Sequence, residues 1–536
     1  MRKLRIGVLD LVAGGPNRSF YARVLFPNFA SVMPQAIAAW CERAGHDVYF
    51  SCYTGSDDVS RSLPPDLDIV FVCAFTHAAY LAYATSCRYR SRGSVTVLGG
   101  PHARAFPNHA RQYFDYVLGL TDEDLLGSIL RDCQSHRPLG LHLSAAKQPQ
   151  HLPGVRERWK YVSQLHAQTV FPATAMLGSL GCPYTCSFCV DAEIPYQTMQ
   201  FDVLKEDLRF LRRRIKHPRV VWHDPNFGVQ FDKYLDLIED SVPPGSVEFV
   251  AESSLSLLSE SRLRRLERNG FKAILPGIES WYELGNKSRC GRSVGIPKMH
   301  EVAEHVQLVL RHIPYVQTNF VFGLDSDEGG EPFELTKQFM ELVPGAFPAC
   351  ALLTGYGRST PLFTRMANEG RLIPVPFPFL YSGFVSNVRP RNYPWTEFYG
   401  HMTSLLKRAF SWRMIRRRSQ AVRGVTAQVI HLVRALSAEG RGRATLLADY
   451  RNRVQTDVEL RKFLEGESKR IPAWMTLRLY EDLGAMKHWL PESALSYECT
   501  DRLPGESTVA APLTVLGTAP FSAFAEGDAR NPQPLR

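Results

Sequence analysis

The sequence predicts an α/β protein with a parallel sheet at the N-terminus, a second barrel-like half, and a mainly helical C-terminal region. Three observations support this prediction. Short apolar runs alternate with helical patterns over the first 130 residues, as in a parallel sheet covered on both faces. A second alternation with six strand candidates at barrel-like spacing follows a polar segment. After about residue 390 the pattern is mainly helical.

The first strand is predicted in "LRIGVLDL", because Asp10 interrupts the apolar run and no small-residue cleavage site of a signal peptide follows. The segment "FASVMPQAIAAWCERAGHDV" has helical apolar spacing and is expected to end at Gly45. Four further strands are predicted in "DVYFSCY", "DLDIVFVCAF", "SVTVLGG" and "DYVLGL". Ligands of such sheets bind at the carboxyl ends of the strands.

Five regions follow from these patterns. The barrel-like half has strand candidates "TAMLGS", "RVVWHD", "SVEFVA", "KAILPGIES", "VQTNFVFG" and "CALLTGY". The stretch from 501 is rich in Pro, Gly and Ala and is expected to be a flexible tail. The predicted boundaries are 1–135 for the N-terminal domain, 136–170 for a linker, 171–388 for the barrel, 389–500 for the helical domain and 501–536 for the tail.

Composition and cysteine usage indicate a cytoplasmic globular protein. The 536 residues are 45% hydrophobic and 22% charged, and no apolar run approaches the ~18 residues that span a bilayer. The 11 cysteines are an odd number spread over a long chain, which argues against a secreted disulfide framework.

The net charge of +10 has one source. Residues 401–470 hold 16 Lys and Arg against 6 Asp and Glu, so the rest of the chain is balanced. The Arg-rich stretch at 405–424 is interpreted as a solvated helix face, with contact to an acidic substrate, a reductase, RNA or a membrane surface as alternatives.

Three cysteines crowd into "GCPYTCSFCV": Cys182, Cys186 and Cys189. Thiolates bind soft metals and iron–sulfur clusters. A structural zinc site needs a fourth ligand, usually from a second C-x₂-C pair, and the sequence has none. Three thiolates in one loop after a barrel strand therefore predict a [4Fe–4S] cluster with one open iron; the alternative is a chance trio of buried thiols.

The stretch "SLGCPYTCSFCVD" resembles the radical S-adenosylmethionine (SAM) superfamily, over roughly residues 171–385. The resemblance implies a partial (β/α)₆ barrel whose open iron binds SAM. It also implies reductive cleavage of SAM to a 5′-deoxyadenosyl radical that abstracts hydrogen from an unactivated C–H bond.

The same resemblance implies SAM-binding residues. Phe188 takes the place of the family's aromatic residue near adenine, and "HDPNFG" resembles its second-strand pattern, with His223 replacing the first Asp. Each of these polar residues has the alternative of a strand end that faces water. The implied SAM-binding set is Phe188, Asp224, Asn226, Glu252, Ser254 and Glu279. "YGRSTPL", with Tyr356 and Arg358, resembles the family's sixth-strand segment and is expected to line the cavity.

The N-terminal stretch "VTVLGGPHARAFPNHA" ends a predicted strand, and its paired glycines suit close approach of a ligand. It resembles the "GGPHA" segment of cobalamin-binding domains fused ahead of radical SAM barrels. The resemblance covers about 1–130 and implies a Rossmann-like domain in which Gly99, Gly100, Pro101 and His102 accommodate the cobalamin nucleotide tail. A domain that has lost cobalamin is the alternative.

The D-x-H-x-x-G motif that supplies a cobalt-ligating histidine in other cobalamin proteins is absent. In the fused family the loop after the third strand runs under the corrin, and here that loop, "AFTHAAY", contains His77. A neutral imidazole can ligate cobalt or approach it. The alternative is a histidine at a helix N-terminus that packs beside Tyr80.

Together the two resemblances imply a cobalamin-dependent radical SAM methyltransferase that uses methylcobalamin and a 5′-deoxyadenosyl radical to methylate an unactivated carbon of a small molecule, such as a natural-product or lipid precursor. Implied partners are that substrate and an electron donor such as flavodoxin or ferredoxin, without nucleic acid. Cyclisation or ring rearrangement without net methyl transfer, RNA modification, and a cobalamin-based sensor are the alternatives.

Overall fold

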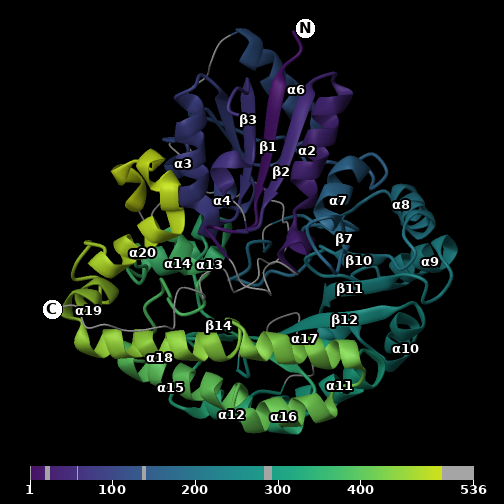
Figure 1. The fold of residues 1–536 in the computed structure, drawn as a ribbon. Helices are drawn as coiled ribbons and strands as arrows, with labels where there is room; N and C mark the ends of the chain where they lie inside the picture. The colour runs from purple at the N-terminus through teal and green to yellow at the C-terminus, as the bar shows by residue number, and fades with distance from the viewer. Residues whose placement is uncertain are drawn as a thin grey trace.

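The computed structural model describes residues 2–17, 25–56, 58–135, 140–192, 194–282 and 293–497. The predicted tail at 501–536 lies outside these residues, as do Cys290 and Cys499. Within the described chain, no helix combines the length and apolarity needed to cross a bilayer. Figure 1 shows an N-terminal sheet above a larger barrel, with C-terminal helices along the side and foot of the molecule.

The N-terminal domain is one parallel sheet of six strands in the order β2-β1-β3-β4-β5-β6. All six residues of β3 are buried, as expected of a strand covered on both faces. The strands are β1 (Arg5–Leu11), β2 (Asp47–Tyr53), β3 (Ile69–Ala74), β4 (Val95–Gly99), β5 (Tyr116–Leu118) and β6 (Leu141–Leu143). The main covering helices are α2 (Val32–Arg43), α3 (Ala79–Arg90) and α6 (Glu123–Ser135).

The strand order reverses between β1 and β3, which creates a topological switch point. In open parallel sheets the ligand binds outside the carboxyl ends of the strands at that point. Here the loop after β1 and the loop after β3, which contains the 3₁₀ turn η3 (Thr76–Ala78), meet there. A side chain at Gly14 in the first loop would collide with the carbonyl oxygen of His77 in the second, so the two loops touch.

The second half is a partial barrel of six parallel strands in the order β14-β13-β12-β11-β10-β7. Its strands are β7 (Thr174–Met176), β10 (Arg219–Trp222), β11 (Glu248–Ser253), β12 (Phe271–Glu279), β13 (Tyr315–Phe322) and β14 (Phe347–Leu352). Its outer helices are α8 (Phe201–Arg214), α9 (Phe231–Ser241), α10 (Glu260–Arg268), α11 (Ile296–His312), α12 (Glu331–Leu342) and α13 (Pro361–Asn368).

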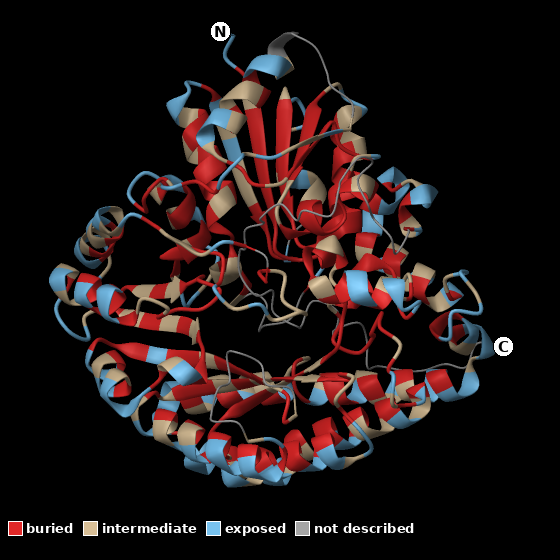
Figure 2. Ribbon diagram, turned by 180° about the vertical axis from the view of Figure 1, so that it is seen from behind, coloured by how far each residue is buried: buried red, intermediate tan, exposed pale blue. Residues whose placement is uncertain are grey.

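Burial alternates along the barrel strands and separates an inner from an outer face. In β11, Phe249 and Ala251 are buried, whereas Val250 and Glu252 are half-exposed. Phe249 packs on Trp222, which packs in turn on Tyr234 of α9, so the buried face lies against the outer helices. Figure 2 shows that the strands of both sheets consist mostly of buried and intermediate residues. The half-exposed face, with Glu252, therefore lines the barrel interior.

The C-terminal region is helical and closes the molecule on two sides. The helices α17 and α18 run along the foot of the barrel, while α20 and the 3₁₀ turn η7 pack beside α3 of the N-terminal domain (Figure 1). The elements are α14 (Phe377–Leu380), α15 (Trp395–Ala409), α16 (Trp412–Ala421), α17 (Val425–Leu436), α18 (Arg441–Thr456), α19 (Val458–Leu464), α20 (Ala473–Leu483), η7 (Gly484–Trp489) and η8 (Glu492–Leu495).

The predicted fold class is confirmed: every predicted strand is present, and the C-terminal region is helical. The stretch predicted as a linker, 136–170, is more than a linker. Its described part contains β6, which completes the N-terminal sheet, and α7 (Trp159–His166). The segment is polar enough to resemble a connection, and β6 is too short to carry a clear apolar pattern.

One buried arginine in that stretch joins the two halves. The Arg158 guanidinium donates to the side-chain oxygen of Gln35 in α2 at 2.7 Å and to the carbonyl of Ala175 in β7 at 3.3 Å. The nearby carboxylate of Asp207 is also buried, and burial raises its pKa to about 6 although Arg158 opposes the shift. Arg158 thus satisfies buried polar groups of both halves.

We predict that Arg158→Met lowers the free energy of unfolding by about 3–5 kcal/mol, because it leaves the Asp207 carboxyl and three buried acceptors without their cation. The exposed neighbour Arg156 offers the control Arg156→Met, which should change stability by less than about 0.5 kcal/mol. Urea unfolding of both variants tests this, and equal midpoints for the two would contradict it.

Candidate active site

The switch point of the N-terminal sheet holds a buried histidine in a defined protonation state. His77 Nε2 lies 3.0 Å from the carbonyl oxygen of Val12, so this nitrogen carries the proton and donates it. Burial lowers the pKa of His77 to about 4, against a smaller opposing effect of that hydrogen bond. Its Nδ1 is buried and has no partner among the described residues. A neutral imidazole with one vacant lone pair therefore sits where the sheet would bind a ligand.

The Gly99-Gly100 pair follows β4, the neighbour of β3. Gly100 adopts a φ of +89°, and a side chain there would press on Cys73 and Ala74. At Gly99 a side chain would meet nothing within 4 Å, so the backbone is open to a ligand.

The next two residues begin helix α4 (Pro101–Ala105). His102 does not face that open backbone: its Nε2 lies 2.6 Å from the Tyr83 hydroxyl, and its ring packs on Phe377 of α14. Burial, followed by the neighbouring His109, lowers the pKa of His102 well below its usual range.

The three cysteines lie in one loop after the short strand β8 (Ser179–Leu180), which pairs with β9 (Gln197–Thr198). Cys182 is buried, and Cys186 and Cys189 are half-buried. The loop is tied internally by the amide of Cys189, which donates to the carbonyl of Cys186 at 2.9 Å. It is tied to the barrel by the amide of Leu362 in α13, which donates to the carbonyl of Ser187 at 2.8 Å.

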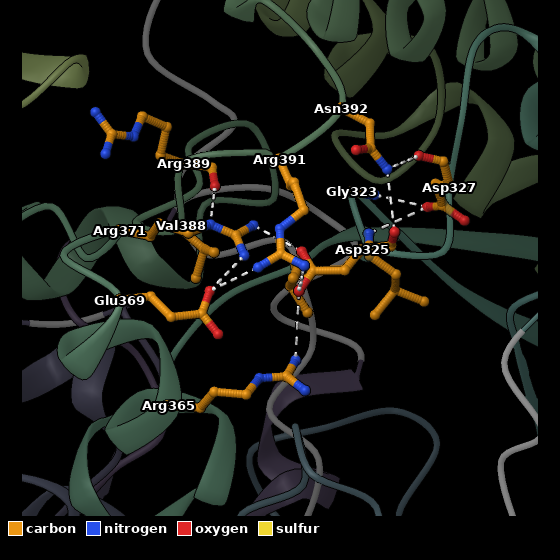
Figure 3. A network of polar contacts seen from close by, with 12 residues as sticks. Gly323, Asp325, Asp327, Arg365, Glu369, Arg371, Val388, Arg389, Arg391 and Asn392 are labelled. Carbon is orange, nitrogen blue, oxygen red and sulfur yellow. Dashed lines mark hydrogen bonds and ion pairs between the residues drawn. The ribbon is translucent and has the colours of Figure 1, made fainter.

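Phe188 points from this loop to a small apolar cluster at the ends of β13 and β14, with Leu324, Leu353 and Leu362. A polar network braces the same end of the barrel (Figure 3). In it, Arg371 bridges Asp325 at 2.8 Å and Glu369 at 3.0 Å. The network lies beyond the carboxyl end of β13 and fixes the segments that carry the cluster.

The residues predicted after the second and third barrel strands lie close together, but their hydrogen bonds differ. Asn226 and Ser254 form a buried pair, with the serine hydroxyl donating to Asn226 Oδ1 at 3.1 Å. The Asn226 Nδ2 donor is buried and has no partner among the described residues. Glu252 lies on the inner face beside them.

The Asp224 carboxylate instead accepts hydrogen bonds from the protein itself. It accepts from the amide of Gly178 at 2.9 Å, from the Ser179 hydroxyl at 2.6 Å and from the Tyr234 hydroxyl at 3.2 Å. Burial raises its pKa to about 6, while these hydrogen bonds oppose the shift. Asp224 thus anchors the turn that leads into the cysteine loop, and it neither faces water nor the barrel interior.

Glu279 ends β12 in a strained conformation. Its φ of +66° makes it the one non-glycine residue with positive φ in the described chain. The ladder with β13 shifts register between Gly277 and Glu279, and the carboxylate fills the space that a side chain on Gly277 would need. Backbone strain of this kind concentrates at functional sites, where it aims a side chain.

The carboxyl ends of the two sheets meet at one junction. There α4 contacts the 3₁₀ turn η6 (Gly357–Ser359) so closely that a side chain on Gly357 would collide with Ala105. The ring of Tyr381 lies 5.2 Å from that of His77 and 4.8 Å from that of Tyr356.

A charged pair spans the same junction. The buried Arg104 of α4 interacts electrostatically with Asp191, two residues beyond Cys189. Burial lowers the pKa of Arg104 to about 10, and Asp191 opposes the shift. The cysteine loop and the "GGPHAR" segment therefore face each other across the junction.

Comparison with known proteins agrees with this arrangement. No protein-family model matches the chain. Bacteriochlorophyllide d C-12(1)-methyltransferase from Chlorobaculum tepidum is 22% identical over 332 residues, which are 60% of this chain and 72% of the relative. Bacteriochlorophyllide d C-8(2)-methyltransferase from the same organism is 24% identical over 316 residues, 54% of this chain and 66% of the relative.

Among solved structures, the cobalamin-dependent SAM radical enzyme OxsB with aqua-cobalamin and SAM bound superposes with a TM-score of 0.53, at 11% identity, over 93% of this chain and 77% of OxsB. The chain has the fold of the cobalamin-dependent radical SAM enzymes. The radical SAM methyltransferase TsrM from Kitasatospora setae, with cobalamin and a [4Fe–4S] cluster bound, matches with a TM-score of 0.50, at 13% identity, over 69% of this chain and 78% of TsrM. The resemblance indicated by the cysteine trio and the "GGPHA" segment is thereby confirmed.

The donor atoms of this radical SAM fold suit the cofactors predicted from sequence. The C-x₃-C-x₂-C loop supplies three thiolates, whereas a structural zinc site would need a fourth ligand. Three thiols on one loop suit a cluster instead, because a cluster spreads its ligands over separate irons. The vacant Asn226 Nδ2 suits a SAM carboxylate, and the open Gly99 backbone and vacant His77 Nδ1 suit cobalamin.

Sequence reasoning missed the residues that join the two halves: Arg104, Asp191 and Tyr381. Arg104 and Asp191 flank recognised motifs, but their pairing across about 90 residues has no local signature. Tyr381 comes from a helical segment without a recognisable pattern. Only the packing of the two sheet edges brings these residues together.

The protonation of His77 gives a testable pH dependence. Its folded pKa of about 4 lies below the ordinary value of 6.5, so the stability it contributes is complete above pH 6.5 and is lost as the pH falls towards 4. We predict that, between about pH 7.5 and about pH 5, the free energy of unfolding falls by about 2 kcal/mol more in the wild type than in His77→Gln. Urea unfolding at both pH values measures the difference. The exposed His151→Gln variant is the control, and parallel losses in wild type and His77→Gln would contradict the prediction.

Proposed function

We propose that this protein is a cobalamin-dependent radical SAM methyltransferase acting on an unactivated carbon of a small molecule. The observation that carries the proposal is the junction itself. The loop with Cys182, Cys186 and Cys189 and the switch point with His77 and Gly99 face each other across the contact between α4 and η6. Two cofactors held there would lie close to each other at the same junction.

We assign the cofactor-binding residues from the sequence resemblance together with the positions described above. The three cysteines would hold the [4Fe–4S] cluster, and Asn226, Ser254, Glu252, Glu279 and Phe188 would contact SAM. The Gly99-Gly100 backbone would receive the nucleotide tail of cobalamin, and His77 would approach its lower face. When bound, the cluster and SAM supply a 5′-deoxyadenosyl radical, and cobalamin carries the methyl group.

The protein's own residues position these groups and exclude water. Buried Arg104 of the switch-point domain and buried Asp191 beside the cysteine loop attract each other electrostatically across the junction. Tyr356 and Tyr381 place aromatic rings between the two edges, where water would quench a reactive intermediate. The strained backbone at Glu279 fixes the direction of its carboxylate inside the barrel.

The relatives support carbon methylation over the alternatives. Both bacteriochlorophyllide d methyltransferases are named for methylation at numbered carbons of a small molecule, and TsrM is a radical SAM methyltransferase. We propose a small organic substrate and a one-electron donor such as flavodoxin or ferredoxin. No observation on the described residues favours ring rearrangement or RNA modification.

The decisive test of activity is anoxic incubation with methyl-labelled SAM, cobalamin, a reductant and a small-molecule extract. We expect the label on a carbon of one extract component, together with 5′-deoxyadenosine and S-adenosylhomocysteine. Formation of 5′-deoxyadenosine with a product that lacks the label would assign the chain to rearrangement chemistry and contradict methyl transfer.

The cysteine trio provides a second test. We predict that the triple variant Cys182→Ala, Cys186→Ala, Cys189→Ala loses iron, acid-labile sulfide and all cleavage of SAM, because three thiolates are the minimum for the cluster. The half-buried Cys87 of α3 offers the control Cys87→Ala, which should keep all three. Retention of iron and sulfide in the triple variant would overturn the cluster assignment.

A further inference from the structure

The large aliphatic residues of helix α17 face solvent. A helix that only packs on the protein core would turn these residues inward. Its buried face consists of Ala427, His431 and Ala435. Its outer face carries an aliphatic stripe spaced as one side of a helix. The stripe residues and their exposures are Val425 at 76%, Val429 at 53%, Leu432 at 43% and Leu436 at 46%.

The neighbouring helix α16 adds cations and an exposed tryptophan. Trp412, 62% exposed, begins α16 and lies 4.6 Å under the guanidinium of Arg441, which follows α17. This contact brings the end of α17 beside the start of α16, so the two helices form a hairpin at the foot of the molecule (Figure 1). An open recess of about 490 Å³ on α16 is lined by Trp412, Arg413, Arg416, Arg417 and Gln420.

The charge of this hairpin has one sign. From 412 to 436 the sequence has six arginines and no Asp or Glu. Glu341 of α12 pairs with Arg408, Arg413 and Arg417 and neutralises part of the excess. Arg416 and Arg423 are exposed and have no salt bridge among the described residues.

We propose that the α16–α17 hairpin docks on the surface of a bilayer rich in anionic phospholipid. An aliphatic stripe bordered by arginines and a tryptophan is the pattern of a helix that lies in the membrane interface. The stripe enters the acyl boundary, Trp412 sits at the headgroup level, and Arg413 and Arg416 contact lipid phosphates in the recess.

Other occupants fit less well. A second copy would bring two arginine-rich surfaces together, and their repulsion opposes association. Nucleic acid would satisfy the arginines but would leave the aliphatic stripe in water. A bilayer of anionic lipid satisfies both features at once.

The test is flotation of the full-length protein with vesicles of phosphatidylcholine alone and of phosphatidylcholine mixed with phosphatidylglycerol. We expect binding to the mixed vesicles that weakens with added salt. Arg413→Gln with Arg416→Gln should weaken that binding about 25-fold, from about fivefold for each arginine. Val429→Asp with Leu432→Asp should weaken it at least tenfold.

The control is Leu477→Asp on α20, an equally exposed aliphatic position outside the hairpin at 64% exposure, which should bind as the wild type does. Circular dichroism confirms that each variant is folded. Failure to bind the mixed vesicles, equal binding to both vesicle types, or equal loss in the Leu477→Asp variant would overturn the proposal. Self-association or capture of an acidic protein that depends on the stripe, without vesicle binding, would also overturn it.

Discussion

The arrangement depends on one constraint: two parallel sheets must bring their carboxyl ends against each other. In each sheet the loops at that end carry the chemistry-bearing residues, because parallel strands finish at a common edge. Contact between α4 and η6 holds the two edges together. Neither half alone brings a switch point to a cysteine loop.

This constraint explains why so many ionisable groups are buried near the junction. Burial lowers the pKa of His77 and Arg104 and raises that of Asp224. Such groups cost free energy unless they are paired or neutral. Here Asp224 accepts three hydrogen bonds, the charge of Asp191 acts electrostatically on Arg104, and His77 stays neutral. These buried groups hold the loops that face the proposed substrate space in place.

The sequence predicted the fold and the cysteine loop because their signals are local. Apolar runs located the strands of both sheets, and three cysteines within eight residues located the loop. The roles of individual polar residues were harder to predict, since they depend on packing between distant segments. His102 turns inward to Tyr83, and Asp224 serves a turn, although both follow strands as binding residues do. The Arg104–Asp191 pair had no sequence signature at all.

The most direct test that the two sheet edges face each other is a measurement of the magnetic interaction between the two bound cofactors. Electron paramagnetic resonance of the anoxic protein, with the cluster reduced and cobalamin as Co(II), measures whether the two centres interact. The account predicts that reduction of the cluster broadens or speeds the relaxation of the cobalt signal. Two independent signals of bound cluster and bound cobalamin, unchanged by each other's oxidation state, would contradict it.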